Sequence, residues 1–229
     1  MGKCTLRATV QNGNHIDSQS PFISEGDEVD FSPDSKLPAH FTHWRFPISE
    51  SYTVSPPDHA NTLRLNPSKL NLTALNGNYA GPEGQTFVGR RQQDTLFTFS
   101  VNLDYQPTLL EEEAGVSVFL TQNHHLDLGV VLLPDTSGEN ENEELIPQLR
   151  FRGETEVAIP EDIVVPLPEA WRNAPLRLEI RASNMTHYTL SAGPADAMPE
   201  IMTVVEVSNE GVSWGFTGKP DLLPIDSLF

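Results

Sequence analysis

Short runs of alternating apolar and polar residues recur along the chain. Apolar residues two positions apart give an extended segment one apolar face and one polar face, as in a half-buried antiparallel strand. The clearest runs are residues 62–65, 96–103 and 176–182. Further strand-like runs are residues 116–120, 126–133, 188–192 and 203–207. The run 126–133 is the most continuously apolar, which favours a central place in a sheet.

Turn-forming residues separate these runs. The 229-residue chain contains 15 glycines and 19 prolines, spread along its whole length. Helical periodicity is weak, and residues 109–114 and 199–202 are predicted to form no more than a turn of helix each. Many short strands between turn residues indicate a β-sandwich or barrel. We predict an all-β fold, a two-sheet antiparallel β-sandwich of the jelly-roll type.

The ends of the chain differ from its middle. Residues 1–29 look irregular, with several Ser and Asn residues and one Pro, and are predicted to form an N-terminal arm or linker. The sandwich is assigned to residues 30–218 and a C-terminal tail to residues 219–229. The acidic run 137–144 is predicted to be a solvated loop. Calcium binding there is a less favoured alternative, because the ligand types fit but the spacing of a known calcium loop is absent.

The charge is strongly acidic, with 14 Lys plus Arg against 32 Asp plus Glu and a formal net charge of −18. Such a surface repels nucleic acid and anionic membranes, and favours a neutral sugar or a protein as partner. The single cysteine, Cys4, excludes an intrachain disulfide. No run is long and apolar enough to span a membrane.

The sequence says less about the cellular compartment of the protein. Two glycosylation sequons, at 71–73 and 184–186, favour an extracellular location, although such short motifs also arise by chance. The first residues lack the apolar run of a signal peptide. A removed signal, a cytoplasmic protein and an excised domain therefore remain alternatives.

The densest polar cluster follows a glycine-rich loop and contains no nucleophile and no acid–base pair, so it indicates binding or docking. If the segment is extended, neighbouring side chains point to opposite faces, and Arg90 with Gln92 or Arg91 with Gln93 can face a ligand. The other pair is then predicted to lie in the interior. One interpretation is a fork that holds sugar hydroxyls or a domain partner. The other is a buried arginine paired with an acid at 111–113. The cluster consists of Arg90, Arg91, Gln92 and Gln93.

Sugar binding also uses aromatic faces that stack on pyranose rings. Trp214 lies in a turn-rich region and is the better candidate for an exposed platform. Trp44 lies in a strand-like segment, where a core position is more frequent. His125 and Asp127 are expected on one face of a strand and could supply two metal ligands. No third ligand is evident, so ordinary polar residues are the favoured interpretation.

Several of these segments, taken in order, resemble a known family: the C-terminal concanavalin A-like β-sandwich domain of glycoside hydrolase family 43 β-xylosidases, also classed as a xylan-binding module. The resemblance covers residues 30–218. The Arg-Arg-Gln-Gln cluster and the Glu-Ala-Gly step are its specific parts. The segments are Asp30-Phe31, His43-Trp44-Arg45-Phe46-Pro47, Leu63-Arg64-Leu65, residues 87–93, Asp104-Tyr105-Gln106-Pro107, residues 112–116, residues 123–128 and Gly215-Phe216-Thr217-Gly218.

The resemblance implies a domain without catalytic residues of its own. It implies either binding of xylan or a related β-linked plant polysaccharide, or packing against the five-bladed propeller that holds the catalytic carboxylates. Phe216 matches the family phenylalanine at the mouth of the active-site pocket. Beyond Gly218, the step Lys219-Pro220-Asp221 departs from the family pattern. A divergent glycoside hydrolase is the third hypothesis, and it requires two carboxylates across a cleft.

Overall fold

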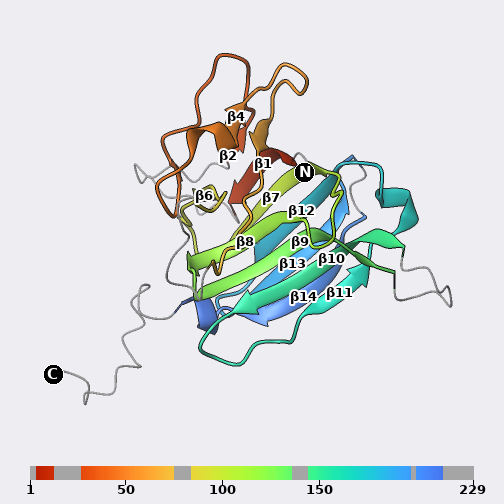
Figure 1. Cartoon of the computed structure of the whole chain (residues 1–229). Helices are drawn as coiled ribbons and strands as arrows, with labels where there is room; N and C mark the ends of the chain where they lie inside the picture. Colours follow the sequence, from red (N-terminus) through yellow and green to blue (C-terminus); the bar gives the residue numbers. More distant parts are fainter. Residues whose placement is uncertain (1–3, 13–26, 75–83, 136–143, 197–199, 214–229) are drawn as a thin grey trace.

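Two antiparallel sheets pack face to face in the computed structural model, which describes residues 4–12, 27–74, 84–135, 144–196 and 200–213 (Figure 1). Within these ranges, helical structure is limited to three 3-10 turns: η1 (Ser49–Ser51), η2 (Glu169–Trp171) and η3 (Glu210–Val212). No helix in these ranges has the length and apolar character that a membrane span requires. The prediction of an all-β, two-sheet antiparallel sandwich is confirmed.

The larger sheet has eight strands. Its order is β14-β13-β12-β7-β1-β5-β4, and β2 also pairs with β1. In chain order the strands are β1 (Cys4–Asn12), β2 (Asp27–Val29), β4 (Tyr52–Val54), β5 (Leu63–Leu65), β7 (Phe97–Tyr105), β12 (Leu176–Ala182), β13 (His187–Pro194) and β14 (Met202–Ser208).

The smaller sheet is a meander of four strands. Its order, β11-β10-β9-β8, pairs strands that follow one another in the chain. The central position predicted for residues 126–133 is confirmed, because β9 lies between β8 and β10. A separate short ladder joins β3 (Phe41–Thr42) to β6 (Gly89–Arg90). The four strands are β8 (Glu113–Thr121), β9 (His124–Pro134), β10 (Leu145–Glu154) and β11 (Ile163–Pro166).

The core lies between the two sheets and is built from alternate residues of their strands. Leu128 of β9 and Phe151 of β10 face Leu178 of β12 and Leu190 of β13, and all four are completely buried. Burying a side chain of this size stabilises the fold by roughly 1.5–3 kcal/mol. The same alternation turns the intervening residues of β8, β9 and β10 to the opposite side, which we call the outer face of the smaller sheet.

All seven strand-like runs recognised in the sequence lie on strands: β5, β7, β8, β9, β12, β13 and β14. The predicted helical turn at 109–114 is wrong. Residues 109–112 form a turn and Glu113 already begins β8. The side chain of Glu112 explains the turn, since its carboxylate accepts the backbone N–H groups of Thr108 and Leu109 at 2.8 and 3.1 Å. Of the turn predicted at 199–202, Pro199 lies outside the described residues, whereas Glu200 and Ile201 are not helical and Met202 begins β14.

The N-terminal strand corrects the sequence interpretation of residues 1–29. β1 lies inside the larger sheet, between β7 and β5, and each of its nine residues pairs with β7. An extended segment beside an unpaired strand satisfies the backbone groups of both, which explains why these residues join the sheet instead of forming an arm. The proposed boundaries at residues 30 and 218 stay predictions.

Between β2 and β7 the chain makes a long excursion, drawn in orange and yellow in Figure 1, along one side of the sandwich. Tyr52 of β4 fixes its two limbs together. The Tyr52 hydroxyl accepts the backbone N–H of Phe87 and donates to the Phe87 carbonyl, both at 3.1 Å. The His43 ring nitrogen Nδ1 lies 3.1 Å from the same carbonyl oxygen. Residues 41–48 and 84–90 therefore run side by side.

Candidate functional site

The outer face of the smaller sheet carries a connected set of charged side chains. Arg150 binds the Glu113 carboxylate through Nη2 at 2.8 Å and the Glu111 carboxylate through Nη1 at 2.8 Å. Arg152 shares Glu113, with Nη2 2.8 Å from Oε2, and its Nε lies 3.9 Å from Asp127. Three carboxylates thus surround two guanidinium groups. We call these five residues the arginine network.

Two facing glycines shape the outer face, and one of them, Gly129, makes room for the arginine network. Gly115 of β8 and Gly129 of β9 lie directly opposite each other. A Cβ at Gly129 would lie 2.8 Å from the Cγ and Oε1 atoms of Glu113, and one at Gly115 would lie 2.1 Å from the carbonyl oxygen of Leu128. The contact at Gly115 is with backbone atoms, so glycine there lets β8 and β9 lie close together. The missing Cβ at Gly129 leaves the space in which the Glu113 side chain lies across β9 toward its arginines.

The arginine network is largely withdrawn from solvent. The side chains of Arg150, Glu113 and Asp127 are 10%, 14% and 11% exposed, whereas Glu111 at the edge is 57% exposed. Burial alone would lower the pKa of Arg150, but the bonds to Glu113 and Glu111 outweigh it and raise that pKa above its usual value. Arg150 therefore stays charged.

His125 continues the same face and lies beside the network. Its Nδ1 is 2.9 Å from Asp127 Oδ2, and its Nε2 is 3.2 Å from the Thr73 hydroxyl. The contact with Asp127 is close but not aligned as a hydrogen bond. The prediction that His125 and Asp127 share a face is confirmed. In the described part of the chain, no three His, Cys, Asp or Glu side chains form a group that could hold a metal ion.

An aromatic cluster covers His125. The Phe119 ring stacks on His125 at 5.8 Å between centroids, and Phe87 and Trp44 pack on Phe119 at 4.7 and 5.3 Å. Trp44 is half-buried, lies in a bend after β3 and is not part of the core between the sheets. The core position favoured for Trp44 is therefore wrong. It fixes the excursion against the outer face instead.

Arg45 and Phe46 follow Trp44 and reach the surface. The Arg45 guanidinium lies over the Trp44 ring at 5.0 Å and donates to the Gln122 amide oxygen at 2.6 Å. Gln122 is only 1% exposed and lies in the hairpin between β8 and β9. Phe46, one residue later, is 96% exposed. A firmly held loop therefore presents a phenylalanine to solvent, together with Ile48, which is 38% exposed.

The Arg90 to Gln93 cluster does not have the predicted arrangement. Only Arg90 belongs to a strand, and residues 91–93 are an exposed loop, so strand alternation does not apply to them. Arg90 donates to Gln93 Oε1 at 2.9 Å, and the Tyr188 hydroxyl lies 3.4 Å from Gln92 Oε1. The predicted buried half of the cluster is wrong: Arg90 is half-buried and the other three are exposed. The arginine that binds Glu111 and Glu113 is Arg150.

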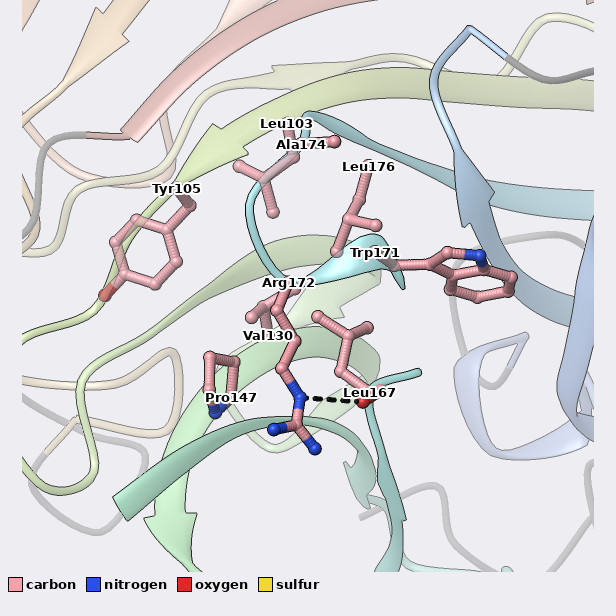
Figure 2. A pocket seen from close by; sticks show the side chains of 9 residues that line it. All are labelled: Leu103, Tyr105, Val130, Pro147, Leu167, Trp171, Arg172, Ala174 and Leu176. Carbon is pink, nitrogen blue, oxygen red and sulfur yellow. Dashed lines mark hydrogen bonds between the residues drawn. The ribbon is translucent and has the colours of Figure 1, made fainter. Parts of the chain in front are cut away.

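Three predicted features lie outside the described residues: Trp214, Phe216 and most of the acidic loop at 137–144. Their roles stay predictions. Between the sheets, near η2, a hollow is lined by Leu103, Tyr105, Trp171 and Arg172, among others, and Figure 2 shows the Arg172 side chain bonded to the Leu167 carbonyl. Its volume is about 10 Å³. This is room for one water molecule at most, and a sugar ring does not fit.

A family model described as the β-xylosidase C-terminal concanavalin A-like domain matches residues 28–219. The chain belongs to this family. The match confirms the resemblance drawn from the sequence, and it includes the arginine network, the aromatic cluster and Phe46. No curated protein matches the chain. As a β-xylosidase C-terminal domain, the matched region is distinct from the catalytic propeller of glycoside hydrolase family 43.

The sequence interpretation missed the arginine network of this β-xylosidase C-terminal domain. Residues 145–154 were not recognised as a strand, although Arg150 and Arg152 alternate there with Leu149 and Phe151. That alternation was the available signal, and it would have placed both arginines on one face. Their carboxylate partners on β8 and β9 lie close to them only because these strands pair with one another, and the order of strands in the chain does not by itself predict that pairing.

Proposed function

We propose that this chain is a non-catalytic accessory domain that docks on the catalytic propeller of a family 43 β-xylosidase. The observation that carries the proposal is Phe46, an aromatic side chain 96% exposed on a loop whose preceding residues are fixed. Single aromatic side chains beside an arginine often dominate protein interfaces. A loop that is already ordered loses little conformational entropy on binding.

The surroundings of Phe46 support a protein partner. Arg45 and Ile48 flank it, and we call Arg45, Phe46 and Ile48 the Phe46 surface. The Arg45 guanidinium is exposed yet oriented by Trp44 and Gln122. The Phe46 surface therefore combines an apolar anchor with a directed cation. A partner that covers about 800 Å² of each protein, the usual interface size, would also reach beyond these three residues.

The test measures association with a family 43 propeller produced without its own C-terminal domain. Analytical ultracentrifugation or calorimetry should detect a complex with the full chain. Phe46→Ser should weaken it roughly thirtyfold or more, as expected for a hot spot worth about 2 kcal/mol. Leu110→Ala is the matched control, because Leu110 is also exposed, at 54%, but lies in the turn before β8. Equal affinities for both variants would contradict a role of the Phe46 surface.

Carbohydrate binding is the second candidate function. Phe46 beside Arg45 also provides an aromatic face and a planar donor, the groups that bind a pyranose ring. Calorimetry of the full chain with xylohexaose separates the two proposals. Carbohydrate binding would be favoured if xylohexaose gives binding heat with the full chain and none with Phe46→Ser, and no complex with the propeller forms. Binding of the propeller without heat from the sugar would favour docking.

A further inference from the structure

The turn between β12 and β13 carries one of the two sequons. Asn184, Met185 and Thr186 are exposed, and Met185 is 72% exposed. Asn209, just after β14, holds the turn from the side: its amide donates to the Met185 carbonyl at 2.9 Å and its backbone N–H to the Thr186 carbonyl at 2.9 Å. The turn is therefore both accessible and fixed in place.

The carboxamide of Asn184 has a defined orientation. Its Oδ1 accepts the backbone N–H groups of Thr186 and His187 at 2.9 and 2.8 Å, and the Thr186 hydroxyl at 3.1 Å. A backbone N–H can only donate, so the atom that faces the turn must be the oxygen. The amide nitrogen Nδ2 is consequently directed away from the turn. A group attached to Nδ2 can extend into solvent without breaking these bonds.

The second sequon is held differently. The hydroxyl of Thr73 is committed to His125, which is 3% exposed. The side-chain amide of Gln85 donates to the carbonyls of Asn71 and Leu72 at 2.7 and 2.6 Å. Leu72 and Thr73 are half-buried. Asn71 itself is exposed, and its Oδ1 accepts the backbone N–H of Ala74 at 3.0 Å. The Thr73 hydroxyl that the sequon requires, however, ties the excursion to the outer face and is not displayed.

We propose that Asn184 of the folded chain is an acceptor for an N-linked oligosaccharide, and that Asn71 is not. The donor class is an oligosaccharide carried on a lipid pyrophosphate. Nδ2 of Asn184 forms a bond to the anomeric carbon, the bond from that carbon to the pyrophosphate oxygen breaks, and the pyrophosphate leaves with the electron pair. The amide gives up one proton, which passes to solvent. This inference is independent of the docking proposal.

The test uses the folded full chain, a purified oligosaccharyltransferase and a synthetic lipid pyrophosphate oligosaccharide, with intact mass as the readout. Wild type and Asn71→Gln should each gain one oligosaccharide. Asn184→Asp should gain none. The aspartate keeps an oxygen for the three turn bonds, so unchanged thermal unfolding of this variant shows that the turn stays intact when the amide nitrogen is replaced.

Three outcomes would overturn the proposal: no transfer to the folded wild type, transfer that persists in Asn184→Asp, or transfer to Asn71 in the folded chain. The urea-unfolded chain is the comparison sample. Both sequons should be modified there, because unfolding releases Thr73 from His125. If only the unfolded chain is modified, the first of these outcomes has occurred, since the folded turn then does not present Asn184.

Discussion

At the scale of single residues, Glu113 is the central carboxylate of the arginine network on the outer face. It accepts bonds from Arg150 and Arg152, and it lies in the space that Gly129 leaves open. A buried ion pair with several partners adds little net stability compared with apolar packing, but removing one member leaves charge without compensation. The arginine network should therefore be sensitive to single substitutions at its centre and tolerant at its edge.

Arg150→Met tests this expectation. The variant leaves Glu113 with Arg152 as its remaining arginine, and losing the buried charged hydrogen bonds of Arg150 should cost about 1.5–3 kcal/mol. Urea unfolding followed by tryptophan fluorescence measures the change. Glu111→Gln is the control, since Glu111 is 57% exposed and exposed pairs contribute about 0–1 kcal/mol. Similar losses for the two variants would show that burial does not set the energetics of the network.

Single residues also show how far the sequence predicted the site. His125 and Asp127 were placed on one face, because alternation depends only on their own strand. Arg150 was not assigned to Glu111 and Glu113, because their strands are paired through the fold and not through spacing in the chain. The sequence points instead to Arg90 and Arg91, since a local cluster of polar residues is visible in a sequence, whereas a buried partner across a sheet is not.

At the scale of elements, the strands with clear alternation were predictable and the excursion was not. β7 and β12 follow a two-residue period set by burial of one face. The limbs 41–48 and 84–90 have no such period, and their position depends on a few contacts. Tyr52 supplies two of these contacts, both to the backbone of Phe87. This one hydroxyl is therefore expected to control the order of a whole loop.

Tyr52→Phe should release the second limb of the excursion. The substitution leaves the half-buried backbone N–H and carbonyl of Phe87 without the hydroxyl, which costs about 1–3 kcal/mol. Hydrogen exchange read by mass spectrometry should show faster exchange in residues 84–90, while β9 and β12 keep their protection. Unchanged exchange in residues 84–90 would contradict the anchoring role. Thr53→Ala is a suitable control, because Thr53 is an exposed neighbour on the same strand.

The same tyrosine gives the stability a dependence on alkaline pH. Burial raises the pKa of Tyr52, although its bond to Phe87 partly opposes this, and burial also raises the pKa of Tyr188. The folded state then keeps protons that the unfolded chain releases above about pH 10. Stability is thus fully present below that pH and falls as the pH rises through the folded-state pKa values. Thermal unfolding between pH 8 and pH 11 should show the fall, and Tyr188→Phe should reduce it. An equal fall in this variant would argue against ionisation of Tyr188.

At the scale of the whole molecule, β1 is the element on which the larger sheet depends. It separates β7 from β5, so both strands lose a partner if it is absent. The sequence contained a signal for it, since Leu6, Ala8 and Val10 alternate with polar residues. That signal was outweighed by the Ser- and Asn-rich residues that follow, which are typical of linkers.

Deletion of residues 1–12 should consequently prevent stable folding. The loss exposes the edge of β7 in the middle of the sheet, and unpaired edges of this kind promote aggregation. Size-exclusion chromatography and near-ultraviolet circular dichroism measure the outcome. Deletion of residues 1–3 alone is the control, because it leaves β1 complete. A compact, cooperatively unfolding protein without residues 1–12 would mean that β1 is dispensable.

The position of β1 also sets an order of events in folding. The strands β8 to β11 pair with their chain neighbours and can form early, whereas Cys4 must meet Tyr105 and Asn12 must meet Phe97. Closing such a long loop costs entropy that only later contacts offset, so non-local sheets form slowly. Pulsed hydrogen exchange should therefore protect β9 before β1, and the reverse order would contradict this. During synthesis, β1 leaves the ribosome before β7, the strand with which all nine of its residues pair. Until β7 emerges, β1 is the segment through which two nascent chains could exchange strands.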